Sequence, residues 1–364
     1  MYIRQNYLNL LYFCRKVVGY FAIATLLAGC AEFEMKSNEK EDSVVVVQVD
    51  KSASVADTST TIEAIERINL VVDDLEAQLQ FYSNATGIRP TAVVKVDLLP
   101  DERIVYGASK GGFRYSELQT PTANLRIIQF DTPSPVKGQV PANGPGMTHT
   151  CFQSVHGSGL YESFKKAGAS FVSRGDSLID MGGYGVLYGY ARDPEGNMIE
   201  LESLDAAVLR SSGYDRNWDN VHDGYWITQA AIATHDIERL MKFYSQVLGF
   251  SPGRFGLFEG NPRLDDVAGF DNTKLYGGWF NFGAGVVLEA WQYVNPKTPS
   301  SENLQVPHSL GYSFSLQVGD IRKEYKRLQG LGVQTLSAPL KIGDEWIFWA
   351  RDTDGNLFSM VQPG

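Results

Sequence analysis

The sequence contains few cysteines, and their positions exclude most cysteine chemistry. There are three in 364 residues: Cys14, Cys30 and Cys151. The first two fall in an N-terminal segment that we expect to be processed, so only Cys151 remains in the folded part. A chain with one such cysteine forms no internal disulfide and no cysteine cluster for zinc or an iron–sulfur centre. We expect Cys151 to be an ordinary buried thiol.

Basic residues are also scarce relative to acidic ones. The chain has 32 Lys and Arg against 42 Asp and Glu, which gives a formal charge of -10 at pH 7. Residues 1–30 carry three basic residues and no acidic one, so their removal takes the charge from -10 to -13. This negative charge disfavours nucleic acids and anionic lipid headgroups as partners, because both require basic surface.

The N-terminal apolar run is too short to span a bilayer as a stable helix. It extends from Val17 to Leu27, whereas a spanning helix needs about 20 apolar residues. A basic start, a short apolar stretch and small residues before Cys30 are typical of a secretory signal in residues 1–30. A plain signal peptide and an uncleaved anchor are the alternatives to the lipoprotein signal considered next.

The end of this segment, Leu27-Ala28-Gly29-Cys30, resembles the bacterial lipobox. The resemblance implies that Cys30 is lipidated and holds the chain on the periplasmic face of the cell envelope. Ala31 follows in place of Asp, so we expect the outer membrane more than the inner one. Residues 31–62 are rich in Ser, Glu, Asp, Lys and Thr and are predicted to be a flexible tether. Its apolar island, 44–47, could instead be a docked strand.

Beyond the tether, one helix pattern recurs along the chain. Asp74 leads to Phe81-Tyr82 and Gly87, and Asp236 leads to Phe243-Tyr244 and Gly249 with the same spacing. Asp is a good N-cap, apolar residues three and four apart form one buried stripe, and Gly suits a helix end. Two further copies are predicted, one beginning at Asp320, and one at 160–167 in which His156 replaces the capping Asp.

The strands that close each unit repeat as well. Arg192–Glu200 matches Arg351–Ser359 position by position, and Leu125–Phe130 corresponds to Leu288–Tyr293. The chain after the tether is therefore predicted to contain four modules. We assign two domains of about 140 residues each, a usual domain size, at 63–204 and 225–364, joined by a linker at 205–224.

The stretch Gly146–Leu204 carries a family resemblance. It runs strand, helix, strands, and closes with Arg-Asp-Pro-Glu-Gly-Asn-Met-Ile-Glu from Arg192 to Glu200. This layout resembles one module of the vicinal oxygen chelate (VOC) superfamily, which includes glyoxalase I, extradiol dioxygenases and the bleomycin and fosfomycin resistance proteins. The resemblance implies an α+β fold of four βαβββ modules arranged as two tandem glyoxalase-like domains. It also implies that the first and last strands of a module each offer one metal ligand into a curved cleft.

Register then gives the ligand positions of each module. Counting seven residues back from each helix cap and aligning the last strands gives, in chain order, Arg67 and Arg126, His149 and Glu200, Gln229 and Glu289, and Ser313 and Ser359. Pairing the two modules within each half makes no convincing metal site. In glyoxalase I, clefts combine modules from different halves, and the same pairing here would unite His149, Glu200, Gln229 and Glu289.

This set is similar to the Gln, Glu, His, Glu ligands of one class of glyoxalase I. One imidazole nitrogen and three oxygens suit one divalent ion such as zinc, nickel, cobalt, manganese or ferrous iron. By position, Glu200 matches the catalytic base of the family and Glu289 is its counterpart. The competing interpretation is that His149 is a satisfied structural residue and the carboxylates are solvated.

Three functions fit the sequence. The first is a metal-dependent lyase or isomerase that moves a proton on a small carbonyl compound or its thiol adduct. The second, an extradiol-type dioxygenase, would need two His and one Glu, and only one His is present here. The third is a non-enzymatic protein that binds a small ligand in a metal-free cleft. A monomer would suffice, since both halves of the cleft lie in one chain.

The remaining positions form a second, vestigial set. Arg67 and Arg126 could bind an anion, but a salt bridge to a neighbouring acid is the favoured role. Trp279, Phe280 and Phe282 are expected to build core, whereas Trp291 shares a strand face with Glu289 and could line the cleft.

Overall fold

The computed structural model describes residues 60–132, 140–183, 185–211, 224–282, 286–300 and 305–364. The predicted signal at 1–30, with Cys30, and the tether up to residue 59 lie outside these residues, as does 212–223 of the predicted linker. Among the described helices, none combines the length and the apolar character that a bilayer crossing needs.

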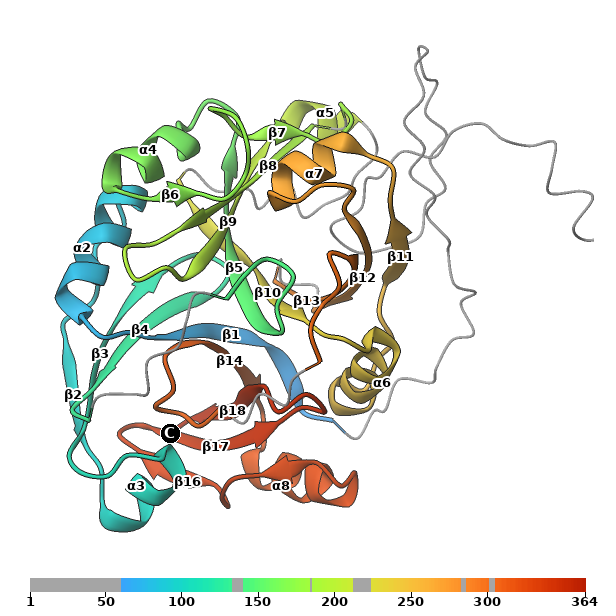
Figure 1. The fold of residues 1–364 in the computed structure, drawn as a ribbon. Coiled ribbons are helices and arrows are strands. Elements are labelled where there is room, and N and C mark those ends of the chain that lie inside the picture. Colours follow the sequence, from blue (N-terminus) through green and yellow to red (C-terminus); the bar gives the residue numbers. More distant parts are fainter. Residues whose placement is uncertain (1–59, 133–139, 184, 212–223, 283–285, 301–304) are drawn as a thin grey trace, which may run out of the picture.

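Four successive modules each begin with a strand and a helix and close with two long strands (Figure 1). Between these parts, modules one and three have a strand and a second helix, whereas modules two and four have two short strands. The first comprises β1 (Ile62–Val71), α2 (Leu75–Thr86), β2 (Val94–Asp97), α3 (Pro100–Tyr106), β3 (Gly112–Gln119) and β4 (Asn124–Phe130). The second comprises β5 (Gly146–Val155), α4 (Leu160–Ala167), β6 (Ser170–Phe171), β7 (Ile179–Asp180), β8 (Val186–Arg192) and β9 (Met198–Leu204). Helix α5 (Ala206–Ser211) then begins the predicted linker.

The second half repeats this order. The third module comprises β10 (Trp226–Ala233), α6 (Ile237–Leu248), β11 (Arg254–Phe258), α7 (Pro262–Ala268), β12 (Lys274–Asn281) and β13 (Val287–Asn295). The fourth comprises β14 (Gly311–Val318), α8 (Ile321–Gly330), β15 (Gln334–Thr335), β16 (Leu340–Ile342), β17 (Glu345–Arg351) and β18 (Leu357–Pro363). The α+β class and the four-module repeat are therefore as predicted.

Helix caps explain why the modules fold alike. Asp74, Asp236 and Asp320 each accept a hydrogen bond from a backbone N–H of the following first turn. Helix α4 departs from this pattern, because its N-cap is Gly159 and it has no side-chain cap. His156 was therefore wrongly assigned as a cap: its Nε2 lies 3.0 Å from the carbonyl oxygen of Ser203.

The modules combine across the two halves of the chain. The first sheet has the order β15-β17-β18-β14-β1-β4-β3-β2, and the second has the order β11-β12-β13-β10-β5-β9-β8-β6. The first thus joins modules one and four through β1 and β14, and the second joins modules two and three through β5 and β10. Neither half forms a sheet by itself, and each sheet has the cross-half pairing that we predicted.

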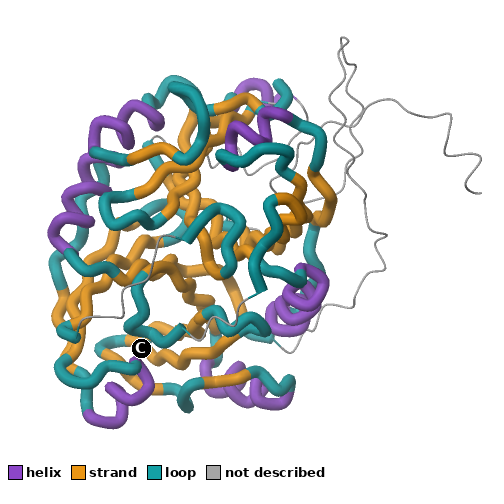
Figure 2. The backbone as a smooth tube through the Cα atoms, in the orientation of Figure 1, coloured by secondary structure: helices purple, strands orange, loops and turns teal. Residues whose placement is uncertain are grey.

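One hydrophobic core lies between the sheets and their helices. It includes Ile68 and Phe314 of the first sheet, Phe152 and Ile227 of the second, and Leu240 of α6. Figure 2 shows the strands in the interior and most helices at the periphery. Strand alternation leaves the opposite face of each sheet for a separate cluster. This opposite face carries the residues that strand register predicted as ligand positions.

The Arg-Asp-x-x-Gly-Asn turn, which occurs twice in the chain, has a structural role. Asp193 accepts hydrogen bonds from the backbone N–H groups of Glu195 and Asn197, and from the hydroxyl of Tyr82 on α2 at 3.1 Å. Asp352 does the same for the other sheet, where Tyr244 of α6 donates at 3.1 Å. Each turn therefore fastens a closing hairpin to a helix of another module.

Candidate metal centre

Four adjacent strands of the second sheet bring the predicted ligand residues together. In the order β13-β10-β5-β9, these strands carry Glu289, Gln229, His149 and Glu200. Ala231 pairs with both His149 and Glu289, whereas Cys151 pairs with both Gln229 and Glu200. Directly paired residues point to the same face, so all four side chains project from one face of the sheet.

The imidazole lies between the two carboxylates. His149 Nε2 is 3.5 Å from Glu200 Oε2 and 3.7 Å from Glu289 Oε2. The ligand atoms of these three residues all lie within 4.8 Å of one another. Residues 149 and 289 belong to different halves of the chain, and the sheet pairing brings them into contact range.

Each of the four residues holds a buried polar atom without a hydrogen-bond partner among the described residues. These atoms are His149 Nε2, Glu200 Oε2, Gln229 Oε1 and Glu289 Oε2. All four residues are at most 5% exposed. Buried polar atoms are normally paired, so four unpaired atoms on one face fit a cation. One nitrogen and three oxygens suit the divalent ions named above.

A neighbouring hydroxyl orients the imidazole. Thr148 Oγ1 lies 2.9 Å from His149 Nδ1 and donates to the backbone carbonyl of Ala231 at 3.4 Å. Because that hydroxyl proton is already used, its oxygen is free to accept from Nδ1–H. This arrangement leaves Nε2 to carry the lone pair that a metal requires.

The two carboxylates are held differently. Trp279 Nε1 donates to Glu289 Oε1 at 2.5 Å, which leaves Oε2 directed toward His149. Glu200 has His149 as its partner at 3.5 Å and accepts no shorter hydrogen bond from the described residues. Glu289 is thus the tethered carboxylate and Glu200 the one that is freer to move.

Burial and mutual charge shift the pKa values of the centre. Burial alone would lower the pKa of His149, but the neighbouring carboxylates of Glu200 and Glu289 outweigh it and raise the pKa to about 9. Burial is the main cause that raises the pKa of Glu200 above its ordinary value. A carboxylate with a raised pKa is a better proton acceptor near neutral pH.

Cys151 lies beside this centre but is a poor ligand. Its sulfur forms a compact group with the carboxylates of Glu200 and Glu202. Burial raises the pKa of the Cys151 thiol well above its usual range, and the neutral thiol is a weak metal ligand. The prediction of a buried thiol is confirmed.

Aromatic side chains cover the ligand face. The cluster includes Tyr190, Phe258, Tyr293, Trp279 and Trp291. Tyr190 packs on the His149 ring with 5.0 Å between ring centroids. Trp291, which could line the cleft according to its strand face, lies in this cluster. Trp279, which we assigned to core, instead donates to Glu289. Trp279 is the direct cross-strand partner of Glu289, and the sequence alone does not reveal that pairing.

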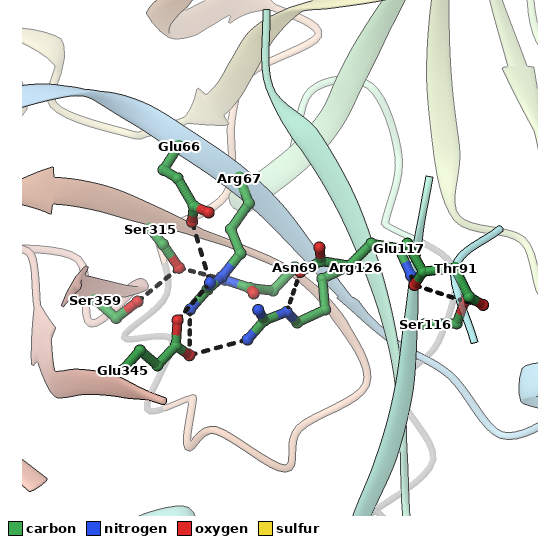
Figure 3. A network of polar contacts seen from close by, with 10 residues as sticks. All are labelled: Glu66, Arg67, Asn69, Thr91, Ser116, Glu117, Arg126, Ser315, Glu345 and Ser359. Atoms are coloured by element: carbon green, nitrogen blue, oxygen red, sulfur yellow. Dashed lines mark hydrogen bonds and ion pairs between the residues drawn. The ribbon is translucent and has the colours of Figure 1, made fainter. Parts of the chain in front are cut away.

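The equivalent face of the first sheet holds an ion-pair network instead (Figure 3). Arg67 donates to both carboxylate oxygens of Glu345, at 2.8 and 2.7 Å. Arg126 donates to Glu345 at 3.0 Å and to Glu117 at 2.6 Å. Ser359 lies 2.8 Å from Ser315, which accepts from Asn69. The favoured salt-bridge role of Arg67 and Arg126 is confirmed, with Glu345 as the acid that sequence reasoning missed.

A known protein family accounts for both the fold and its repeat. A family model described as the Glyoxalase/Bleomycin resistance protein/Dioxygenase superfamily matches residues 64–201 and 226–360. No curated protein sequence matches the chain significantly.

Solved structures share the fold at low sequence identity. Glyoxalase I from Zea mays is similar with a TM-score of 0.53 and 17% identity, over 82% of this chain and 92% of that one. A putative dioxygenase from Bacillus subtilis is similar with a TM-score of 0.52 and 11% identity, over 84% and 86% of the two chains. Since the family model matches both halves and most of the sequence, this chain belongs to the Glyoxalase/Bleomycin resistance protein/Dioxygenase superfamily.

Proposed function

We propose that this protein is a divalent-metal-dependent lyase or isomerase of glyoxalase type, which transfers a proton on a small carbonyl compound or its thiol adduct. The observation that carries the proposal is the set of four buried, unpaired ligand atoms on His149, Glu200, Gln229 and Glu289. A metal-free cleft would leave Gln229 Oε1 unpaired and would hold two buried carboxylates beside a single imidazole, at considerable cost.

The difference between the two carboxylates suggests their roles. Trp279 holds Glu289 in place, which suits a fixed ligand. Glu200 has no such tether and a raised pKa, which suits a base that takes a proton from one carbon and returns it to the next. When bound, the metal would polarise the carbonyl oxygen and stabilise the negative charge that develops there.

Replacing the base tests the reaction. We expect Glu200→Gln, whose amide oxygen can still ligate, to retain metal but to lose about 100- to 10,000-fold in kcat, the usual contribution of a general base. The assay would follow conversion of 2-oxoaldehyde adducts of several thiols by the metal-loaded protein. Ser359→Ala, at the matching position of the first sheet, is the control and should retain full activity. Unchanged turnover in Glu200→Gln would exclude Glu200 as the base.

We further propose that the protein acts at the bacterial envelope, anchored by a lipid on Cys30. The proposal rests on the Leu27-Ala28-Gly29-Cys30 pattern, and several acyl carbons per chain would make the anchoring stable. We expect Cys30→Ala to lose fatty-acid labelling and leave the membrane fraction, whereas Cys14→Ala keeps both. Retained labelling in Cys30→Ala would refute the assignment. Because glutathione is mainly cytosolic, another thiol or a free carbonyl is then the better substrate candidate.

A further inference from the structure

A chain of buried hydrogen bonds leads to the amide of Gln229. Trp226 Nε1 donates to Gln153 Oε1 at 2.9 Å, and Gln153 Nε2 donates to Glu202 Oε2 at 2.5 Å. Gln229 Nε2 then donates to Glu202 Oε1 at 3.2 Å. All four residues are buried, and Glu202 has no exposed surface.

The chemistry of the groups gives this chain a direction. The indole N–H of Trp226 can only donate, so the oxygen of Gln153 must face it and the nitrogen must face Glu202. Gln229 Nε2 faces Glu202 Oε1 in the structure, and an ionised Glu202 only accepts, which fixes this orientation. Because burial raises the pKa of Glu202 to about 8, the affinity measurements are made above that pH. The oxygen of Gln229 is thereby left pointing away from Glu202, and it is one of the four unpaired atoms of the candidate metal centre.

The other sheet offers an internal comparison. Gln153 pairs with Glu202 in the second sheet, and the matching pair in the first sheet is Gln317 with Val361. The first sheet has Arg67 in place of Gln229, so this position carries no amide to orient. A buried carboxylate is costly. Position 202, which lies next to the amide of Gln229, carries one, whereas the equivalent position 361 carries a valine.

We propose that Glu202 is a positioning residue that fixes the amide of Gln229 with its oxygen toward the metal, through the relay Trp226–Gln153–Glu202–Gln229. The inference rests on the proposed metal centre. It assigns Glu202 a role in ligand orientation and none in contact with substrate.

The test compares metal affinity in the full chain and its variants. The Glu202→Gln variant keeps the shape of the side chain but can place an N–H group opposite Gln229. The Gln229 amide can then turn its oxygen toward residue 202. We expect Co²⁺ affinity to fall about 10- to 100-fold, as for other residues that support metal ligands. Gln229→Ala should give a similar loss, and the double variant should lose no more than the larger single loss. The visible absorption of bound Co²⁺ in Glu202→Gln should match that of Gln229→Ala.

The outcomes separate the relay from the metal centre itself. No Co²⁺ binding by the wild type would overturn the proposed centre. Binding that depends on Gln229 but is unchanged in Glu202→Gln, or additive losses in the double variant, would overturn the relay alone. Ser359→Ala serves as the control for buried polar changes in the other sheet. Should Glu202→Gln fail to fold, Trp226→Phe removes the donor that starts the relay. It must then weaken Co²⁺ binding, and wild-type affinity would refute the proposal.

Discussion

Replacing His149 with alanine is expected to abolish stoichiometric metal binding. Its Nε2 is the one nitrogen in the candidate set and lies between the carboxylates of Glu200 and Glu289. Residues that merely support a ligand contribute 10- to 100-fold to affinity, so loss of this ligand should cost more than about 100-fold. The measurement is metal content per chain after expression of residues 31–364 with mixed divalent metals. Glu289→Ala should lose the ion in the same way.

Proton release gives a second readout of the same binding event. His149 in the metal-free protein has its pKa raised to about 9, so near pH 8 it still holds a proton that the metal must displace. Wild-type binding at pH 8 should therefore release a proton, and affinity should increase as pH rises toward 9. Ser313→Ala changes the matching position of the first sheet and should bind metal normally. An ion retained by both His149→Ala and Glu289→Ala would show that it binds elsewhere.

The strand positions that meet on the candidate site could be predicted because each module fixes them locally. A first strand runs directly into a capped helix, so the distance from the cap to the strand position is set by geometry within one module. Residues 149 and 229 were found in this way. Pairing between modules was not visible in the sequence, and it was inferred only from the family resemblance.

Contacts made across strands and modules were not predicted. Glu345 lies at the start of β17, outside the positions that register selects, and reaches Arg67 only because β14 and β1 join the two ends of the chain. Trp279 and Glu202 escaped notice for a related reason. A polar or aromatic residue on a strand face can be core, surface or support, and only its neighbours on adjacent strands decide which.

The two sheets therefore carry different kinds of side chain at equivalent strand positions. The second sheet carries three oxygens and a nitrogen whose lone pairs are unpaired. The first sheet carries two guanidinium groups, and Glu345, Glu117 and Glu66 supply compensating carboxylates from within the chain. Among the described residues, the candidate metal centre thus lies on the second sheet and an ion-pair network takes its place on the first.

Neutralising Glu345 should destabilise the fold without affecting metal binding. Glu345→Gln leaves Arg67, whose side chain is 2% exposed, and Arg126 without their shared carboxylate. Breaking a buried pair from one side costs about 3–5 kcal/mol. We expect the lower end, about 3 kcal/mol of unfolding free energy, since the Glu345 side chain is 21% exposed. Denaturant unfolding would measure it.

The charge state of Glu345 supports this expectation, and two controls sharpen it. Burial would raise the pKa of Glu345, but Arg67 and Arg126 outweigh it and lower the pKa, so the folded protein holds the charged form more strongly than the unfolded chain. Asp97→Asn removes an acid from the exposed pair with Lys95 and should leave stability unchanged. Replacing Glu66, Arg67, Glu117, Arg126 and Glu345 together with methionine should recover most of the loss, because every charge of the network is then removed. Wild-type stability in Glu345→Gln would mean that solvent already compensates the two arginines, and an anion-binding role for them would then regain support.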